Sequence, residues 1–379
     1  MIQKILNHNF VLVLFAQFNF SLVFQILIPT LPIYLSRLGS TEAEIGVLIG
    51  SFFFSSLILR PFIGRALTKI PEKTIMTIGA FLFALTSVAY LLVSPFWPFL
   101  IVRLFQGIGF AFFNTASITL IVNISPETHR GRSVTYSYLG MNLAGALGPS
   151  LGMVLINHFS FNFLFLVCLG LSLCSLFITY KLGRRQVAPL QDSFIEDGLF
   201  LSRKAIAPSI IGFFFLFILG ALTTFFPLYA INHEVSNPGL FFTTIAIMLI
   251  LCRVLGGKTL DLYSKERIIL PCLFTCIISM IILAFSKSLP MFILVAVIWG
   301  IGHAFFIPTL VVYTLDRVGS SPGPVMGTLT AINDLGQSLG PVIMGIILHM
   351  TSYPIMFLCL ALIGIVNLNY FYFFVRKKG

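Results

Sequence analysis

Apolar residues in this chain come in blocks of about 20, and this block length constrains the fold more than any other feature. At ~1.5 Å per residue, a helix of that length spans the ~30 Å hydrocarbon core of a bilayer. Only 9% of the 379 residues are charged, against roughly a quarter in soluble proteins. Membrane β-barrels show shorter segments of alternating hydrophobicity. The pattern therefore predicts an all-α polytopic membrane protein.

We expect twelve membrane-spanning helices in two groups of six. The approximate spans are 8–36, 43–66, 73–94, 97–124, 130–156, 160–181, 206–232, 238–259, 267–286, 289–314, 322–348 and 353–375. A polar loop divides six spans from six. It predicts an N-terminal six-helix bundle over 1–181, a cytoplasmic linker over 182–205 and a C-terminal six-helix bundle over 206–379. The first span is too long for a signal-peptide core, so we expect it to remain in the mature protein.

The net charge of +11 reports orientation in the membrane. Most of the 23 Lys and Arg lie at the two termini and in the even-numbered loops, whereas Arg37 and Lys287 lie on the other side. The positive-inside rule then places both termini in the cytoplasm, in a multi-pass protein of the cytoplasmic (inner) membrane. We therefore interpret the basic charge as topology and expect no nucleic-acid partner.

Cysteine and histidine spacing predicts no metal site and no cofactor. All six cysteines fall in apolar spans. Cys272 and Cys276 share a helix face, but no His or second Cys pair completes a ligand set. We expect free, packed thiols.

The two halves repeat one another at a nearly constant offset. "RPFIGRAL" begins at Arg60 and "RVLGGKTL" at Arg253, 193 residues later. "GIGFAFF" begins at Gly107 and "GIGHAFF" at Gly300, again 193 residues later. "LGP" at 147–149 recurs at 339–341. Two parallel six-helix repeats are typical of carriers that alternate access to a midplane site.

Several motifs resemble those of the major facilitator superfamily over essentially the full chain. "GRALTKIPEK" (64–73) is similar to the family's loop 2–3 signature, with Thr68 in place of its acid. "RLFQGIG" (103–109) resembles the span-4 motif, and "GALGPSLG" (145–152) resembles the Gly-Pro motif of antiporters. Within that family, bacterial efflux carriers, including sugar- and metallophore-exporting members, contain stretches that resemble "FFPLYA", "NPGLFFT" and "NDLGQSLG" of this chain. The resemblance implies two pseudo-symmetric bundles and a non-enzymatic, proton-coupled efflux carrier.

Asp334 and His303 are the expected proton-coupling residues. Asp334 lies about 12 residues, or ~18 Å, along a helix that rises from the cytoplasm. His303 lies ~21 Å from the outer end of its own span. A carboxyl in apolar surroundings and an imidazole can both change charge near neutral pH. The alternatives are a packing acid bonded to Asn333 or Gln337, and a satisfied core histidine.

Arg103 is a third candidate for proton coupling. It lies near the outer start of its span, where an arginine could simply snorkel to the interface. The resemblance instead implies that it faces the central cavity, with Gln106 and Asn114 close to it.

Polar residues in apolar spans are candidates to bind the solute. Because the chain has 41 phenylalanines, we expect a partly aromatic cavity wall, which suits an amphipathic or ring-bearing solute. These residues are Gln17, Asn19, Gln25, Gln106, Asn114, Asn142, Thr223 and Thr224.

The expected cytoplasmic latch and hinge combine basic residues with Gly-Pro pairs. The basic residues could instead serve only to orient the protein in the membrane, and the Gly-Pro pairs could serve only close helix packing. The candidates are Arg60, Gly64, Arg65, Lys69, Gly145, Gly148, Pro149, Arg253, Gly257, Asp261, Gly340 and Pro341.

We therefore predict a secondary active transporter that exports a small organic solute in exchange for protons, works as a monomer and meets membrane lipid along its sides. Proton-coupled uptake would use the same residues in the opposite direction. A lipid flippase is the second alternative, and an ion channel or membrane enzyme, for which no filter loop or nucleophile–base pair is present, is the third.

Overall fold

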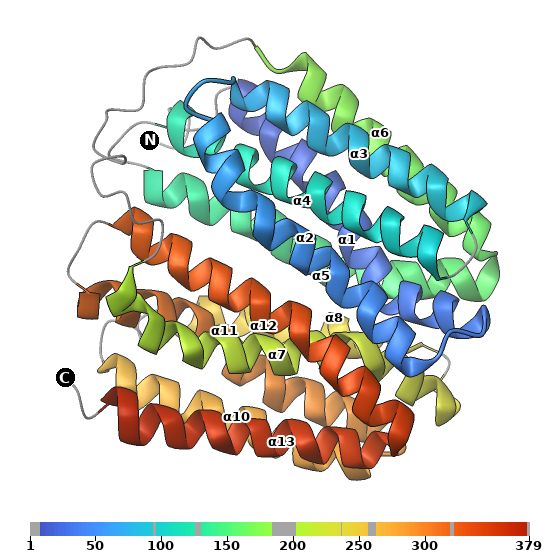
Figure 1. The fold of residues 1–379 in the computed structure, drawn as a ribbon, viewed down its shortest axis with the longest axis vertical. Helices are drawn as coiled ribbons and strands as arrows, with labels where there is room; N and C mark the ends of the chain where they lie inside the picture. Colours follow the sequence, from blue (N-terminus) through green and yellow to red (C-terminus); the bar gives the residue numbers. More distant parts are fainter. Residues whose placement is uncertain are drawn as a thin grey trace. The chain divides into compact units, whose positions relative to one another are not determined.

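The computed structural model describes residues 8–93, 96–125, 130–183, 202–235, 237–256, 263–318 and 322–376, with the side chains of 130–139 and 322–324 left aside. Within these ranges the chain forms twelve long helices (Figure 1). They are α1 (His8–Arg37), α2 (Glu42–Ala66), α3 (Glu72–Leu92), α4 (Trp97–Ile124), α5 (Arg130–His158), α6 (Phe161–Lys181), α7 (Arg203–Asn232), α8 (Gly239–Gly256), α10 (Lys265–Phe285), α11 (Leu289–Val318), α12 (Pro322–Met350) and α13 (Tyr353–Tyr370), which continues as a π-helical turn over Phe371–Val375.

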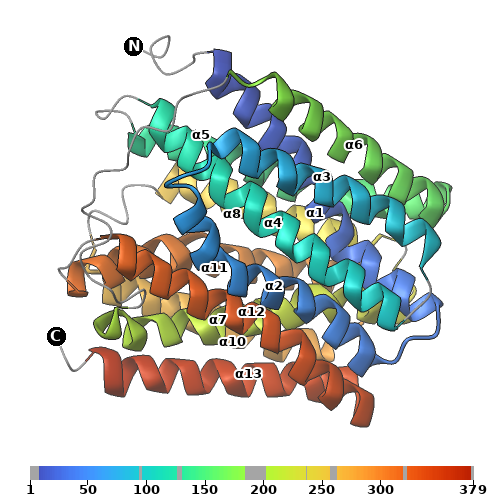
Figure 2. The same ribbon diagram turned by 45° about the horizontal axis from the view of Figure 1, so that its top comes forward.

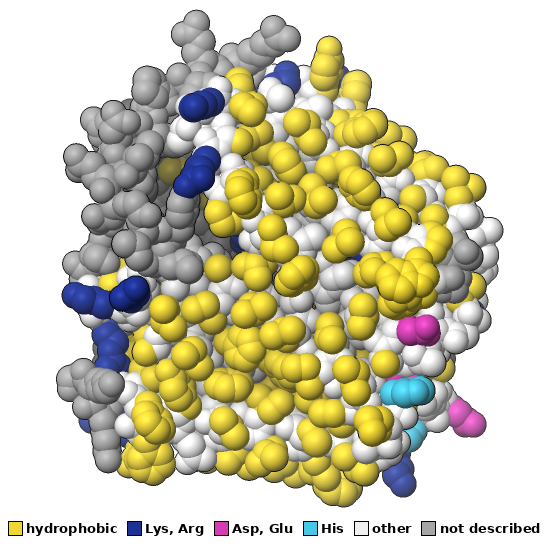
Figure 3. Space-filling model, viewed as in Figure 1, with side chains coloured by type: hydrophobic (Ala, Val, Ile, Leu, Met, Phe, Trp, Pro, Cys, Tyr) yellow, Lys and Arg dark blue, Asp and Glu magenta, His cyan; other side chains and the backbone are white. Residues whose placement is uncertain are grey.

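Among the described residues, eleven of these helices are long and apolar enough to cross a membrane. The exception is α5, in which Gly, Ser and Asn dilute the apolar residues, although its 29 residues suffice in length. On the face seen in Figure 3, hydrophobic side chains cover the sides of the helices and Lys and Arg gather near one set of helix ends. The predicted all-α, twelve-helix membrane fold is confirmed.

The chain divides into two compact units. Unit 1 comprises Met1–Tyr34 and Phe54–Glu196, and unit 2 comprises Leu35–Phe53 and Asp197–Gly379. The first half of α2 therefore belongs to unit 2, together with α7 to α13. We describe each unit by itself.

Each unit uses the same helix pairs. In unit 1, α3 packs against α4 and α6, and in unit 2 α10 packs against α11 and α13 (Figures 1 and 2). Gly79 of α3 meets Gly109 of α4, and the matching contact in unit 2 joins Cys272 of α10 to Gly302 of α11. The sequence offset of 193 residues thus reappears as repeated packing.

Glycines set a second pair of matching contacts. In unit 1, Gly148 of α5 lies against Gln25 of α1. In unit 2, Gly340 of α12 lies so close to Phe217 of α7 that an added Cβ would collide with its carbonyl oxygen. Small residues allow such close helix approach in membranes, where packing replaces the hydrophobic effect as the driving force.

We predict that Gly340→Leu destabilises the protein by ~1–3 kcal/mol or more, because the added side chain overpacks the contact with α7. Thermal unfolding of the detergent-purified protein measures this. Gly170→Leu in α6 is the matched control, since an added Cβ there meets nothing within 4 Å. Equal unfolding temperatures for the two variants would contradict the tight contact.

Candidate functional site

Helix α12 carries the candidate site, and one of its faces packs on α7. Gly336 and Gly340 approach the backbone of Phe213 and Phe217, while Asn333 points its side-chain oxygen at Gly212. We name this contact the α7–α12 seam. A Cβ at Gly336, Gly340 or Gly212 would collide with its neighbour, so this face of α12 is held against α7 by backbone contact.

A second face of α12 packs on the first half of α2. An added Cβ at Gly46 would collide with the carbonyl oxygen of Pro341, and one at Gly50 would lie 2.5 Å from that of Ser338. The hydroxyl of Ser338 donates a hydrogen bond of 3.0 Å to the Gly50 carbonyl. An added Cβ at Gly345 would lie 2.6 Å from the Glu42 carbonyl oxygen. We name this contact the α2–α12 seam.

An ionisable pair closes the end of the α2–α12 seam. Nδ1 of His349 lies 3.2 Å from a carboxylate oxygen of Glu42, and both side chains are partly exposed. The start of α2 is fixed by a capping box, in which Thr41 N–H donates to Glu44 and Glu44 N–H donates to the Thr41 hydroxyl. That cap determines which α2 residue meets α12. An exposed pair of this kind contributes at most ~1 kcal/mol.

Asp334 lies on the same face as the α2–α12 seam. It precedes Ser338 by four residues, so helix periodicity places the two on one side of α12, a single turn apart. The side chain is partly buried. The carboxyl therefore stands next to a stretch of α12 where the backbones of the two helices approach closely.

His303 lies among aromatic rings rather than polar groups. Its ring centroid is 5.4 Å from that of Phe215 on α7 and 6.2 Å from that of Trp299, while Phe215 stacks on Phe306 at 4.0 Å. Within the described part of the chain, Nδ1 of His303 is buried without a hydrogen-bond partner. The guanidinium of Arg253 is near enough to interact with it electrostatically.

Arg103 is buried inside unit 1. Its guanidinium donates a 2.5 Å hydrogen bond to Oε1 of Gln106, which also accepts one from the Tyr90 hydroxyl of α3. The Tyr90 ring in turn lies 5.0 Å from Phe99 and 5.3 Å from Phe165. Arg103 is 5% exposed and Gln106 1%. The structure therefore brings Arg103 and Gln106 together, as expected, and ties them to α3; Asn114 lies three turns along α4 and is partly exposed.

The remaining solute candidates have mixed surroundings. Thr223 and Thr224 donate to the Gly220 carbonyl of their own helix, at 3.1 and 2.8 Å. Asn19 donates to the Phe15 carbonyl at 2.8 Å. Gln17 is buried, and Gln25 and Asn142 are partly exposed, Gln25 lying against Gly145 and Gly148. Gln25 and Asn142 therefore remain candidates to contact a solute.

The expected latch is described only in part. Gly64, Arg65 and Lys69 are exposed at the end of α2 and just beyond it, and Arg60 is partly buried. Gly257 and Asp261 lie outside the described residues. Pro149 and Pro341 lie inside α5 and α12. Pro341 is part of the α2–α12 seam itself.

Sequence analysis missed the α2 side of this site. Gly46, Gly50, Glu42 and His349 were not among the expected functional residues. The spacing of Gly46 and Gly50, a small-xxx-small pair, was the available signal, because it marks a helix face that approaches another closely.

Two kinds of comparison place the chain among known proteins. The pattern that describes the Major Facilitator Superfamily matches residues 13–323 and 238–379. The staphylopine export protein of Staphylococcus aureus is 24% identical over 346 residues, which cover 87% of this chain and 86% of that protein. The quinolone resistance protein NorA of the same species is 25% identical over 365 residues, covering 92% and 93%.

Solved structures share the fold at low sequence identity. A point mutant of the nucleoside transporter NupG superposes with a TM-score of 0.81 at 16% identity, over 97% of this chain and 100% of that one. A POT family transporter in complex with a thioalcohol-conjugated peptide also gives 0.81, at 14% identity, over 97% and 96%. These likenesses concern the fold alone.

We predict that cysteines replacing Glu42 and His349 form a disulfide within minutes of oxidation, because the native side chains are in contact. A gel-shift assay on a chain whose six native cysteines are replaced measures this. The matched control pairs His349→Cys with Glu44→Cys, since Glu44 is held in the cap of α2. Equal rates for both pairs would contradict the α2–α12 seam.

Proposed function

We propose that this chain, which belongs to the Major Facilitator Superfamily, exports a small amphipathic organic solute across the bacterial cytoplasmic membrane in exchange for protons. Membership makes it a multi-pass membrane transporter and not an enzyme. The direction of transport, the solute and the coupling ion are our proposal. Relatives named for staphylopine export and quinolone resistance support the outward direction.

One observation carries the coupling: Asp334 lies a single helical turn from the tightly packed α2–α12 seam. When the seam is closed, the apolar contact next to the carboxyl favours its neutral, protonated form. When the seam opens, water reaches that face of α12 and the carboxylate is stabilised. Opening of the seam and the charge of Asp334 are thus linked, and each biases the other by the same free energy.

This linkage orders a transport cycle. With both termini in the cytoplasm, the Glu42–His349 end of α12 is the outer end. On the cytoplasmic side, solute enters and Asp334 releases its proton to the interior. The ionised carboxylate then favours opening of the outer seam, through which solute leaves and a proton returns from outside. The protonated carboxyl then permits the seam to close. The empty carrier therefore returns with Asp334 neutral, which avoids the cost of burying an unpaired charge.

The remaining candidate residues have supporting tasks. Gln25 and Asn142 offer polar contacts to the solute, and the nearby phenylalanine rings suit an aromatic or amphipathic partner. The positive charge of Arg103 and the ring of His303 are proposed to tune proton transfer. Arg60, Arg65 and Lys69, with the second-half residues Arg253 and Asp261, are proposed to latch the cytoplasmic side.

We predict that Asp334→Asn lowers solute-driven proton flux by more than about tenfold, because an amide cannot bind and release a proton in this range. Proteoliposomes loaded with a pH-sensitive dye measure the flux on addition of staphylopine or a quinolone. Asp316→Asn is the matched control, since this acid is exposed at the end of α11.

Three outcomes of this experiment bear on the proposal. Flux in wild type and the Asp316 variant, but not in the Asp334 variant, supports coupling through Asp334. Equal flux in all three chains makes Asp334 a packing acid. If an imposed proton gradient drives solute and protons in the same, inward direction, the protein is an uptake symporter and the proposed export is wrong.

We predict that His303→Phe leaves the unfolding temperature nearly unchanged while it lowers proton flux. Phenylalanine fits because the first repeat has Phe110 at the matching position and because Phe215 and Trp299 already stack around this site. Thermal unfolding and the same flux assay measure the two effects. Unchanged flux in a stable variant would make His303 a core residue of the aromatic cluster.

A further inference from the structure

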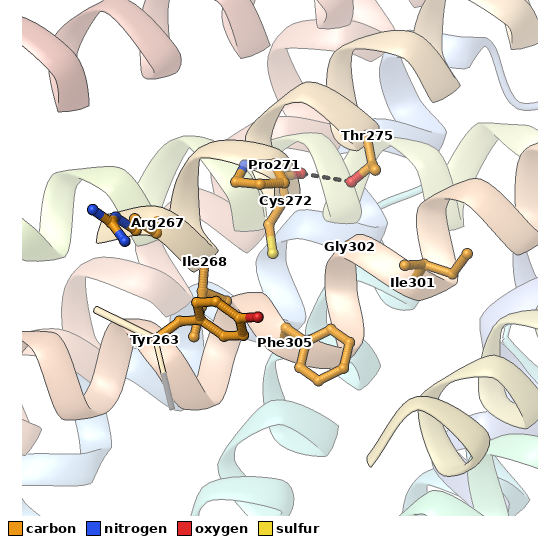
Figure 4. Close-up of a pocket in the computed structure, with 9 residues that line it drawn as sticks. All are labelled: Tyr263, Arg267, Ile268, Pro271, Cys272, Thr275, Ile301, Gly302 and Phe305. Atoms are coloured by element: carbon orange, nitrogen blue, oxygen red, sulfur yellow. Dashed lines mark hydrogen bonds between the residues drawn. The ribbon is translucent and has the colours of Figure 1, made fainter. Parts of the chain in front are cut away.

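Unit 2 contains a cavity that the transport cycle does not use. It lies between α10 and α11, has a volume of about 290 Å³ and is lined by Tyr263, Arg267, Pro271, Cys272, Ile301 and Phe305, among others. In Figure 4 the Cys272 sulfur points toward the space between Tyr263 and Phe305, with Arg267 at one end and Ile301 at the other.

The cavity lies beside a close contact between the two helices. An added Cβ at Gly302 would collide with the Thr275 hydroxyl, so α10 and α11 approach closely at this point. Thr275 lies against this glycine, and its hydroxyl is turned back on the Cys272 carbonyl at 2.8 Å. Pro271 has no N–H and therefore cannot donate the helical hydrogen bond to the Arg267 carbonyl. The cavity forms an apolar slot along this helix pair.

The slot opens toward lipid rather than toward the protein interior. Both helices are long and apolar enough to span the membrane. Ile301 on its wall is exposed, as are Phe274 and Ile278 on the same stretch of α10. Exposed apolar side chains in the middle of a membrane helix face hydrocarbon. Lipid acyl chains therefore lie next to the open side of the slot.

A cation stands at the end of the slot. Arg267 lies in the first turn of α10, is exposed and belongs to the lining. Within the described part of the chain, the adjacent carboxylate of Glu266 pairs with Arg376, 3.7 Å away. Tyr263 also lines the slot, and its hydroxyl points toward Phe305 (Figure 4). Guanidinium groups bind phosphate oxygens through paired, charge-assisted hydrogen bonds.

We propose that this slot binds an anionic phospholipid of the cytoplasmic leaflet. One acyl chain lies along Ile301 and Phe305, and the phosphate is held by Arg267. The start of α10 lies on the cytoplasmic side by the distribution of basic residues, and that leaflet carries a negative surface potential that attracts such groups. The lipid would brace α11 beside His303, the neighbour of Gly302.

Native mass spectrometry of the purified full-length chain tests the site without transport. The protein is mixed with equal amounts of phosphatidylglycerol and phosphatidylcholine that share the same acyl chains. We expect wild type to retain phosphatidylglycerol several-fold in excess and Arg267→Gln to lose that preference. Arg203→Gln is the matched control, because Arg203 is an exposed cation in the first turn of α7 and lies outside the lining.

A second variant tests the acyl-chain slot. Ile301→Trp fills the slot from its exposed wall, and we expect it to lower retention of both lipids. Inorganic phosphate at millimolar concentration is expected not to displace phosphatidylglycerol, since the slot holds the chain as well as the headgroup.

Several results would overturn the site. These are an unchanged lipid preference in Arg267→Gln, an equal loss of preference in Arg203→Gln, unchanged retention in Ile301→Trp, or displacement by phosphate alone. Because the readout is lipid retention, a failure here leaves proton coupling through Asp334 intact, and a failure of that coupling leaves the lipid site intact.

Discussion

The close approach of the α12 backbone to two neighbours is the constraint on which the rest of unit 2 depends. Glycines at 336 and 340 bring α12 against α7, and glycines at 46 and 50 bring the first half of α2 against α12. Contacts this tight exclude water and permit few intermediate spacings, because a packed interface is bistable rather than continuously deformable. We propose that Asp334, one turn away on the same helix, senses whether this contact is closed.

The two repeats share a framework but differ where function is proposed. Gly148 meets Gln25 in unit 1, and the matching Gly340 meets Phe217 in unit 2. His303 likewise stands where the first repeat has Phe110. Unit 1 keeps its buried charge as Arg103, held by Gln106 and Tyr90, while unit 2 has a titratable acid and a histidine. The symmetry therefore supplies the scaffold, and we propose that the departures from it supply the chemistry.

The sequence predicts the fold well because membrane helices are determined locally. Length and hydropathy suffice to locate a span, and a constant offset between motifs reveals the repeat. The site is harder to predict from the sequence, because contacts between helices that are far apart in the chain do not follow from periodicity. The 103–106 pair lies on one helix and could be predicted, whereas the Tyr90 hydroxyl that completes it comes from α3. The Glu42–His349 pair joins residues about 300 positions apart, and no spacing rule connects them.

The distance between the outer ends of α2 and α12 tests the coupling most directly. Spin labels at Leu38 and Met350, both exposed, report it by double electron–electron resonance in nanodiscs. We predict that in the wild type with bound solute a second, longer distance between the two labels appears at alkaline pH. In Asp334→Asn we expect only the short distance at every pH. The same longer distance in the Asp334 variant would contradict control of the α2–α12 seam by this carboxyl.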